Sequence, residues 1–275
     1  MTNNSDPDTT SNSESEQIVS RSQNLVEMTN ISKSFGGLRA LQKVDITVPT
    51  GAVVAIVGDN AAGKSTLMKI LTGAYQSDSG NISFEGETVS IRTPGDSKKL
   101  GIEMIYQDLA LCPNRNVTTN IFLGREKTLL HLGILKVLDW VGMKAKARAI
   151  LETLQIQIGS LESPLRKLSG GQRQAVAIGR AVSFSPKLVI MDEPTASLAL
   201  KEVDAVLDLI RQLQQSGISV ILISHRLDDV FAVSDSIFVL RAGRMVRKFM
   251  TQEVVPDEVI RHMFLGHTSD GDDND

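Results

Sequence analysis

A loop with two glycines, a lysine and a serine is the feature of this sequence that points most directly to chemistry. Residues 58–65 fit the pattern G-x-x-x-x-G-K-[ST], which binds polyphosphate. Glycines let the backbone approach the phosphates, and a helix after the loop offers unpaired N–H donors and a partial positive charge. Such loops use their lysine, here Lys64, to reach the β- and γ-phosphates and their hydroxyl, here Ser65, to ligate Mg²⁺. The ATP and Mg²⁺ site predicted from this pattern comprises Gly58, Asp59, Asn60, Ala61, Ala62, Gly63, Lys64, Ser65 and Thr66.

The alternative for this loop is an accidental turn. A chance match to the pattern has a probability on the order of 1% in a chain of this length. The context that function requires is also present, because a run typical of a buried strand precedes the loop and helical spacing follows it. Ala61 stands where many such loops have another glycine. If the backbone there needs a positive φ, alanine costs roughly 1 kcal/mol, and because the pattern permits any residue we expect function to survive.

Two adjacent acids end an apolar run at residues 188–193. Asp192, at the mouth of a buried strand, suits the carboxylate that holds Mg²⁺ through its shell. Glu193 projects in another direction and could polarise an attacking water as a general base. An acidic exit from a strand to a loop is an equally good interpretation of the two acids alone. Together with the phosphate loop, however, they favour a catalytic role.

The elements that must position these residues alternate between strand and helix. Apolar runs at residues 52–57, 188–193 and 219–224 have the length of strands buried on both faces, as in parallel sheets. Helical spacing covers residues 64–71, with Gly73 as a C-terminal cap. A further helix carries one apolar face, made by Val203, Val206, Leu207, Ile210 and Leu213. The alternation predicts an α/β domain with a mainly parallel sheet and helices on both sides.

Other segments complete the expected organisation. More strands are expected at residues 25–31 and 44–48, and near 237–240 and 245–249 around a turn at Ala242 and Gly243. Residues 102–165 lack buried strand-like runs and carry helical stretches at 134–142 and 144–154, so we interpret them as a helical lobe inserted between core segments 24–101 and 166–267. The polar residues 1–23 and the acidic residues 268–275 should be disordered, because they have little apolar surface to bury.

Composition excludes several classes of function. The 275 residues carry 29 basic and 32 acidic side chains, a net charge of −3, which gives no reason to expect a nucleic-acid partner. The single cysteine, Cys112, excludes an internal disulfide and a cysteine-built metal cage, and it fits a reducing compartment. No window has the roughly eighteen apolar residues needed to span a bilayer, and no secretion signal is visible. A role at a membrane would therefore need a membrane-embedded partner.

Residues 168–172, Leu-Ser-Gly-Gly-Gln, precede a helix rich in alanine and valine and would form a second helix N-terminus able to bind an anion. Taken alone they are more typical of an ordinary helix cap. In order along the chain with the phosphate loop, Gln107, the acids of 188–193 and His225, however, this sequence resembles the ATPase subunits of ABC transporters, of which LSGGQ is the signature. The resemblance covers about residues 25–265 and implies a P-loop NTPase with a RecA-like core, a small antiparallel β subdomain and an inserted helical lobe.

The resemblance also implies roles for single residues. Phe35 matches the aromatic residue that stacks on adenine, with a core phenylalanine as the alternative. Gln107 matches the glutamine that senses Mg²⁺ and the attacking water, and His225 matches the histidine that contacts the γ-phosphate. The implied catalytic residues are thus Glu193, His225 and Gln107, and the implied metal site comprises Ser65, Gln107 and Asp192.

In this family ATP is held between two subunits. The implied homodimer, or pair with a related ATPase subunit, places ATP between the phosphate loop of one chain and Ser169, Gly170, Gly171 and Gln172 of the other. Further implied partners are integral membrane permease subunits and, indirectly, an external solute-binding protein. The chain would then lie peripherally on the cytoplasmic face of the cell membrane. One departure is Ala199, where the family often has an aspartate in a loop that crosses the dimer interface, so communication between the two sites is expected to be weaker or rerouted.

Residues 34–41, 102–111 and 120–126 resemble the monosaccharide importers in particular. Many of those fuse two ATPase modules, whereas this chain has one and is similar to the single-module fructose-type subunits. Two alternatives remain. A soluble ABC-type ATPase acting on ribosomes or DNA would need a second module with a charged linker, or a long coiled coil, and neither is visible. A regulatory module that holds ATP without hydrolysing it is disfavoured by four intact residues, which are Lys64, Asp192, Glu193 and His225.

Overall fold

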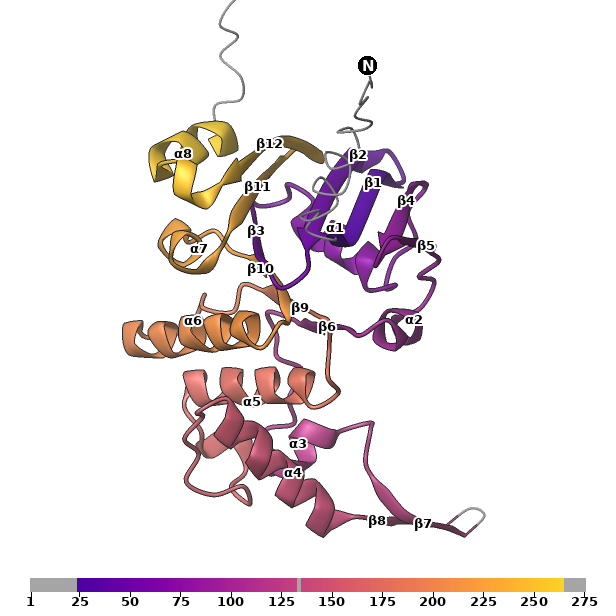
Figure 1. The fold of residues 1–275 in the computed structure, drawn as a ribbon, viewed down its shortest axis with the longest axis vertical. Coiled ribbons are helices and arrows are strands. Elements are labelled where there is room, and N and C mark those ends of the chain that lie inside the picture. The colour runs from indigo at the N-terminus through magenta and orange to yellow at the C-terminus, as the bar shows by residue number, and fades with distance from the viewer. Residues whose placement is uncertain (1–23, 133–134, 265–275) are drawn as a thin grey trace, which may run out of the picture.

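The computed structural model describes residues 24–132 and 135–264. Figure 1 shows a stack of layers, with two sheets above, a pair of helices in the middle and a helical lobe below. The termini that we predict to be disordered lie outside the described residues. In the part of the chain that is described, no helix is both long enough and apolar enough to cross a membrane.

The central sheet has six strands among the described residues, in the order β12–β11–β3–β10–β9–β6. Neighbours from β11 to β6 run parallel, and β12 joins the edge antiparallel to β11. The strands are β3 (Val53–Val57), β6 (Ile102–Ile105), β9 (Leu188–Asp192), β10 (Ser219–Ile223), β11 (Ser236–Arg241) and β12 (Arg244–Met250). The predicted mainly parallel sheet is confirmed.

Strand β3 explains why an unbroken apolar run belongs here. Val53, Ala55 and Val57 point into the core shared with the helices below the sheet. Val54 and Ile56 point to the opposite face, into the core shared with the antiparallel sheet above. Both faces of the strand are therefore covered, and alternation with polar residues would place polar groups in a core.

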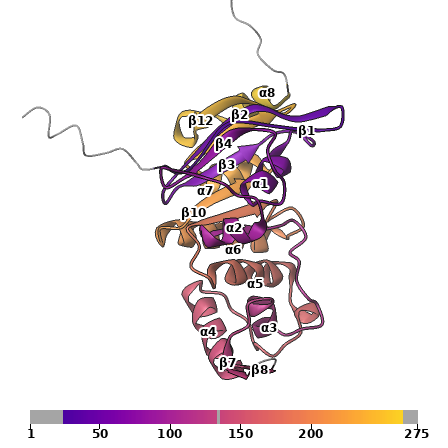
Figure 2. The same ribbon diagram turned by 90° about the vertical axis from the view of Figure 1, so that its right-hand side faces the viewer.

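Helices cover both faces of the sheet. The helix after the phosphate loop, α1 (Lys64–Leu71), lies above it, and Gly73 follows with a φ of +74°, as predicted for a C-terminal cap. Below lie α5 (Gly170–Val182) and α6 (Leu200–Gln215), side by side in Figures 1 and 2. All five apolar residues predicted on one face of α6 are buried. The remaining helices of these layers are α2 (Pro94–Lys99), α7 (Leu227–Val233), α8 (Pro256–Phe264) and the 3-10 helix η2 (Thr251–Glu253).

A second sheet packs on α1 from above. It is antiparallel and has four strands in the described residues, in the order β2–β1–β4–β5. They are β1 (Asn24–Phe35), β2 (Leu38–Pro49), β4 (Ser79–Phe84) and β5 (Glu87–Val89). Leu25, Val26 and Ile46 of this sheet share a core with Leu67 and Met68 of α1, so the small antiparallel subdomain holds the helix that begins at Lys64.

The lobe below the sheet corrects two predictions. Ile102–Ile105, which we assigned to the lobe, is strand β6 and pairs parallel with β9 at the sheet edge, so the lobe begins after it. The helix predicted at 134–142 is wrong over Leu135–Leu138, which is strand β8, paired with β7 (Thr128–Leu132). Helix α4 (Trp140–Thr153) confirms the predicted stretch at 144–154. The lobe also contains α3 (Val117–Phe122) and the 3-10 helix η1 (Leu165–Lys167).

Candidate active site

The phosphate loop connects the carboxyl end of β3 to α1, between a buried strand and a buried helix. Gly58 and Gly63 have φ values of +153° and +106°. A Cβ on Gly58 would collide with the carbonyl oxygen of Leu240, and one on Gly63 would lie 2.7 Å from that of Ala40. Only glycine lets β2 and β11 approach the loop this closely. Ala61 between them has a φ of +66°, so the left-handed conformation considered above is present at an alanine.

Lys64 begins α1 and is 8% exposed. Its Nζ donates to the carbonyl oxygens of Gly58, at 2.6 Å, and Asp59, at 3.0 Å. Burial lowers the pKa of Lys64, while the negative charges of Glu193, Asp192 and Asp59 act to raise it. The ammonium group therefore lies beside the loop in a position from which it can face a bound polyphosphate.

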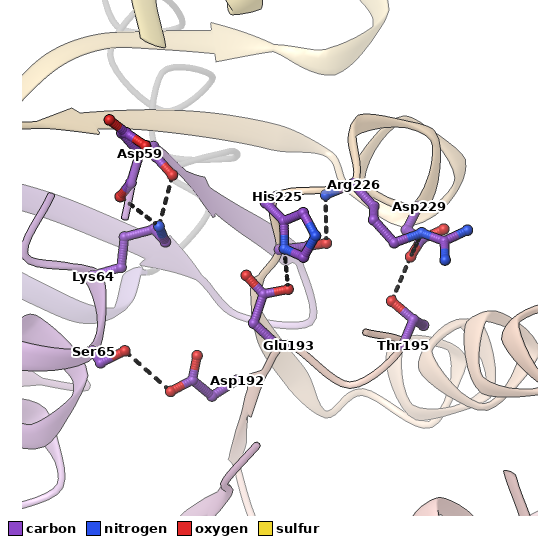
Figure 3. A network of polar contacts seen from close by, with 11 residues as sticks. Asp59, Lys64, Ser65, Asp192, Glu193, Thr195, His225, Arg226 and Asp229 are labelled. Atoms are coloured by element: carbon purple, nitrogen blue, oxygen red, sulfur yellow. Dashed lines mark hydrogen bonds and ion pairs between the residues drawn. The ribbon is translucent and has the colours of Figure 1, made fainter. Parts of the chain in front are cut away.

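Ser65 and Asp192 meet across the site, although 127 positions separate them. The Ser65 hydroxyl donates to Asp192 Oδ2 at 3.2 Å (Figure 3). Burial raises the pKa of Asp192, and the hydrogen bond from Ser65 acts against that rise. Among the described residues no cluster of three or more His, Cys, Asp or Glu side chains could cage a metal. One carboxylate and one hydroxyl fit Mg²⁺ nonetheless, because Mg²⁺ is usually held by one or two carboxylates together with substrate phosphates and waters.

Glu193 lies just after β9 and turns away from Asp192. Its φ of +52° is unusual for a residue with a side chain, and its amide donates to Ile223 O at 2.9 Å. One carboxylate oxygen, Oε2, lies 2.7 Å from Nδ1 of His225 (Figure 3). The Glu193 side chain is 14% exposed and that of His225 60%. A strained backbone at the end of a buried strand thus points a nearly enclosed carboxylate at an accessible histidine.

A polar network beside this pair was not predicted from the sequence. The buried Thr195 hydroxyl donates to Asp229 Oδ2, and the guanidinium of Arg226 forms an ion pair with the same carboxylate at 3.3 Å (Figure 3). It ties the loop after Glu193 to α7 and so holds Glu193 and His225 in place. The signal was an acid three positions after Arg226, which is too common a spacing to single out.

The phosphate loop, the Ser65–Asp192 pair and Glu193 line one cavity. It has a volume of about 590 Å³, and its lining includes residues 60–66, Gln107, Asp192, Glu193 and Phe35. Phe35 is 42% exposed and touches the ring of Tyr75 edge-on, with centroids 5.3 Å apart, so the alternative that it is a core residue is wrong. His225 lines an adjoining cavity with Gly58, Asp59 and Asn60. Sequence reasoning missed the remaining lining residues, which are Leu38, Arg39, Ala40, Gln42, Ala242 and Gly243.

The signature residues lie elsewhere. Ser169 caps α5, accepting from the Gln172 amide at 3.2 Å, while Gln172 Oε1 accepts from the Ser169 amide at 3.1 Å. Of the described residues that line the two cavities at the phosphate loop, none belongs to 169–172. Ser169, Gly171 and Gln172 instead line a groove against α6. One chain therefore does not bring its own signature helix to its own phosphate loop.

The sequence profile of the ABC transporter family matches residues 41–196, more than half of the chain. This chain belongs to the ABC transporter family. The match covers the phosphate loop, Gln107, the signature residues and both acids at the end of β9.

Relatives of this ABC protein include ATP-binding proteins for sugar import. The chain is 42% identical over 240 residues to the xylose/arabinose import ATP-binding protein XylG of Sulfolobus acidocaldarius, covering 87% of this chain and 93% of the relative. It is 38% identical over 239 residues to the ribose import ATP-binding protein RbsA of Caldanaerobacter subterraneus subsp. tengcongensis. That match covers 87% of this chain and 47% of the relative, so the chain spans about half the length of RbsA.

The fold of this ABC protein is similar to that of a solved cassette. The ADP conformation of MJ1267, an ATP-binding cassette of an ABC transporter, has a TM-score of 0.77 and 30% sequence identity, covering 89% of this chain and 99% of that one. The α/β P-loop architecture expected from the resemblance is therefore shown.

The loop before α6 carries the departure from the family pattern. Ala199 is the N-terminal cap of α6 and offers no side-chain oxygen. Glu202, at the third position of α6, makes the reciprocal half of a capping box, because its Oε2 accepts from the Ala199 amide at 3.3 Å. Its other oxygen, Oε1, accepts from the amide of Gly171 in the signature helix at 3.0 Å. Sequence reasoning missed Glu202, since nothing in the sequence pairs residues on these two helices.

Proposed function

We propose that this ABC transporter subunit hydrolyses Mg²⁺-ATP in the cavity at the phosphate loop and so powers the import of a monosaccharide. The observation that carries the proposal is the convergence of Lys64, the Ser65–Asp192 pair and Glu193 on one cavity. These residues come from two segments of the chain that lie 127 positions apart, and packing alone gives no reason for their charged and polar groups to converge on one cavity.

Before hydrolysis, ATP is held mainly by charged groups and hydrogen-bond donors. The amides of the loop and Lys64 bind the phosphates, and Lys64 exchanges the carbonyls of Gly58 and Asp59 for phosphate oxygens. Ser65 and Asp192 would hold Mg²⁺, which when bound neutralises charge on the β- and γ-phosphates. Phe35, exposed at the cavity mouth beside Tyr75, stacks on the adenine ring.

Hydrolysis needs a base beside the γ-phosphate. Glu193 accepts a proton from water as the water oxygen attacks the γ-phosphorus, and the bond from that phosphorus to the bridging oxygen of ADP breaks. Because Oε2 of Glu193 faces His225, Oε1 remains available for the water. His225 positions Glu193 and reaches the γ-phosphate from the adjoining cavity. Gln107, which lines the same cavity as Glu193, orients the water and the metal shell.

The signature helix completes the site in a dimer. Ser169 and the amide of Gly171 offer donors at the start of α5, but they face a different cavity from the chain's own loop. A two-fold pair of chains resolves this, because each chain presents its signature helix to the ATP held by the other. ATP then favours the closed pair by adding contacts made only there, and hydrolysis removes them.

The substrate and the remaining partners follow from the relatives. Because XylG and RbsA are import proteins for pentoses, we assign a monosaccharide as the transported solute. Transport across a bilayer requires integral membrane permease subunits, with an external solute-binding protein delivering the sugar. The chain then acts as a peripheral subunit on the cytoplasmic face of the membrane.

Replacing the proposed base tests the hydrolytic site. Glu193→Gln keeps the shape of the side chain but removes the proton acceptor, so we expect turnover to fall by about 100-fold or more. ATP should then stabilise the dimer, as measured by sedimentation. The control is Glu87→Gln, an exposed carboxylate on β5. Turnover of Glu193→Gln at the wild-type rate would remove Glu193 from the mechanism.

Transport is tested separately from hydrolysis. In membrane vesicles from cells that lack this chain, ATP-driven uptake of labelled xylose, arabinose or ribose should be lost. Added wild-type chain should restore uptake of at least one sugar, and Lys64→Ala should not. Full uptake of all three in its absence would contradict the assignment to monosaccharide import while leaving the ATPase site untouched.

A further inference from the structure

Glu202, near the start of α6, reaches across to the first turn of the signature helix. Its Oε1 accepts the Gly171 amide at 3.0 Å. Its Oε2 accepts the Ala199 amide at 3.3 Å. One carboxylate therefore connects the signature helix to the loop that precedes α6.

The two signature glycines make room for this contact. A Cβ on Gly171 would lie 2.9 Å from Cβ of Glu202, and a Cβ on Gly170 would lie 2.9 Å from Cδ2 of Leu198 and 3.4 Å from Oε2 of Glu202. Neither glycine has a positive φ, so a left-handed conformation does not explain them. Their lack of a side chain lets a carboxylate come within hydrogen-bond distance of the helix N-terminus.

The charges agree with the geometry. The N-terminus of a helix favours an anion, and hydrogen bonds from Gly171, Ser169 and Ala199 lower the pKa of Glu202, with Arg173 adding a smaller effect in the same direction. Glu202 is therefore an anion at neutral pH. It occupies the Gly171 amide, one of the groups that the proposed dimer directs at the partner's γ-phosphate.

We propose that the Glu202 carboxylate is an internal substitute for the γ-phosphate and has to leave Gly171 before two chains can close on ATP. This inference rests on the dimeric site proposed above. The γ-phosphate and the Glu202 carboxylate are both anions and would compete for the single N–H of Gly171, so closure requires the Glu202 side chain to rotate away. The contact thereby raises the ATP concentration at which the dimer forms.

The same movement links the two halves of the dimer site. When Glu202 leaves Gly171, its second hydrogen bond, to Ala199, is no longer held in place from the α5 side. A change at the signature helix therefore alters a contact of the loop between Glu193 and α6 in the same chain. The methyl group of Ala199 cannot make a polar contact across the dimer interface, so Glu202 supplies an alternative route.

The test measures the monomer–dimer equilibrium in a Glu193→Gln background across a range of ATP concentrations, by sedimentation velocity. Glu202→Gln removes the charge but can still accept from Gly171, so it keeps the cap. Glu202→Ala removes both. Asp204→Asn removes one charge from an exposed position of the same helix and is the matched control. ATP binding to each monomer is measured in parallel at low protein concentration.

We expect Glu202→Gln and Glu202→Ala to lower the ATP concentration for half-maximal dimer by about 5-fold or more, with Asp204→Asn unchanged and monomer affinity for ATP equal in all chains. A purely structural cap predicts a different result, with Glu202→Gln unchanged and Glu202→Ala shifted upward or unfolded. That result, or an unchanged midpoint in both Glu202 variants while the parent dimerises, overturns the inference and leaves the proposed function intact. Failure of the parent and of every variant to dimerise with ATP overturns the proposed dimer itself.

Discussion

The phosphate loop and the signature helix both present a helix N-terminus, but the two differ in what surrounds it. At the loop, Lys64 is buried, and Asp192 and Glu193 arrive from the end of another strand, so the site holds charges of both signs in fixed positions. At α5 the donors are at the surface, and the nearest anion is Glu202 from the neighbouring helix.

This difference means that the two helix N-termini serve different steps, which are nucleotide binding at the loop and closure of the dimer at the signature helix. The loop has enough fixed groups to bind and orient a nucleotide within one chain, and the frame of β3, β9 and β10 keeps them rigid. The signature helix has donors alone and becomes useful only when an anion is brought to it. Binding is therefore a property of one chain, and closure is a property of two.

The largest effect should come from breaking the loop site. Lys64→Ala removes the cation that faces the β- and γ-phosphates, so we expect ATP binding to weaken and turnover to fall by at least 100-fold, with the apo fold little changed. Nucleotide affinity and steady-state hydrolysis are the measurements. Lys99→Ala, at the exposed end of α2, serves as the control for loss of a lysine. Wild-type affinity in Lys64→Ala would contradict our interpretation of the loop.

A change at the signature site should spare ATP binding and abolish hydrolysis, unlike a change at the loop. Ser169→Arg places a long cation at the start of α5, so ATP should bind the monomer with unchanged affinity while dimer formation and hydrolysis are lost. An arginine at exposed Ser160, nine positions earlier in the chain, should change neither. Loss of ATP binding by the isolated Ser169→Arg monomer would mean that the signature residues act in the pocket of their own chain.

The pH dependence of folding stability offers a test of the environment of Asp192. Its pKa is raised by burial above the value of 3.8 for an unfolded chain, so the folded state favours the protonated form. Its contribution to stability is present in full below that value and is lost as pH rises through the raised pKa. Asp192→Asn should thus unfold at a higher temperature than wild type near pH 7, and at nearly the same temperature below the unfolded pKa.

The activity of Asp192→Asn should move in the opposite direction, because the amide is a poor ligand for Mg²⁺. Thermal melts from pH 3.5 to 7.5 and hydrolysis assays at several Mg²⁺ concentrations make the comparison. Asp204→Asn should change neither property. A variant that is less stable than wild type at pH 7 would show that the Ser65 bond outweighs burial at this carboxylate.

The parts of the structure that local sequence determines were predictable. The buried runs of β3 and β10 and the spacing of α6 each fix an element without reference to a partner. Strand β6 was missed because Glu103 and Met104 are only partly buried at the sheet edge, so its four residues lack a buried run. Leu135–Leu138 lay in a predicted helix because apolar residues recur in that stretch at helical spacing, but antiparallel pairing of its backbone with β7 outweighs that local signal.

The site shows the same division. The phosphate loop, both acids and the signature could be located because each is a contiguous motif. The pairs that make them work could not, since Ser65 and Asp192 are 127 positions apart and Gly171 and Glu202 are 31 apart. Nor could the sequence give the backbone angle at Glu193, which depends on its hydrogen bond to Ile223.

The smallest expected effect concerns Ala61, whose left-handed backbone conformation is unfavourable for a residue with a side chain. Ala61 has a φ of +66°, which costs an alanine about 1–2 kcal/mol, whereas glycine adopts it freely. Glycine also loses about 0.4–1 kcal/mol through the greater entropy of the unfolded chain, so Ala61→Gly should be more stable by about 0.5–1 kcal/mol in urea unfolding. Ala62, buried next to it with no positive φ, provides the contrast, because Ala62→Gly gains nothing in conformation and should be less stable. ATP affinity should change little in Ala61→Gly, since the same left-handed backbone is retained. Equal destabilisation by both substitutions would show that the backbone at Ala61 is not strained, and the contrast between a strained loop and an unstrained signature helix would disappear.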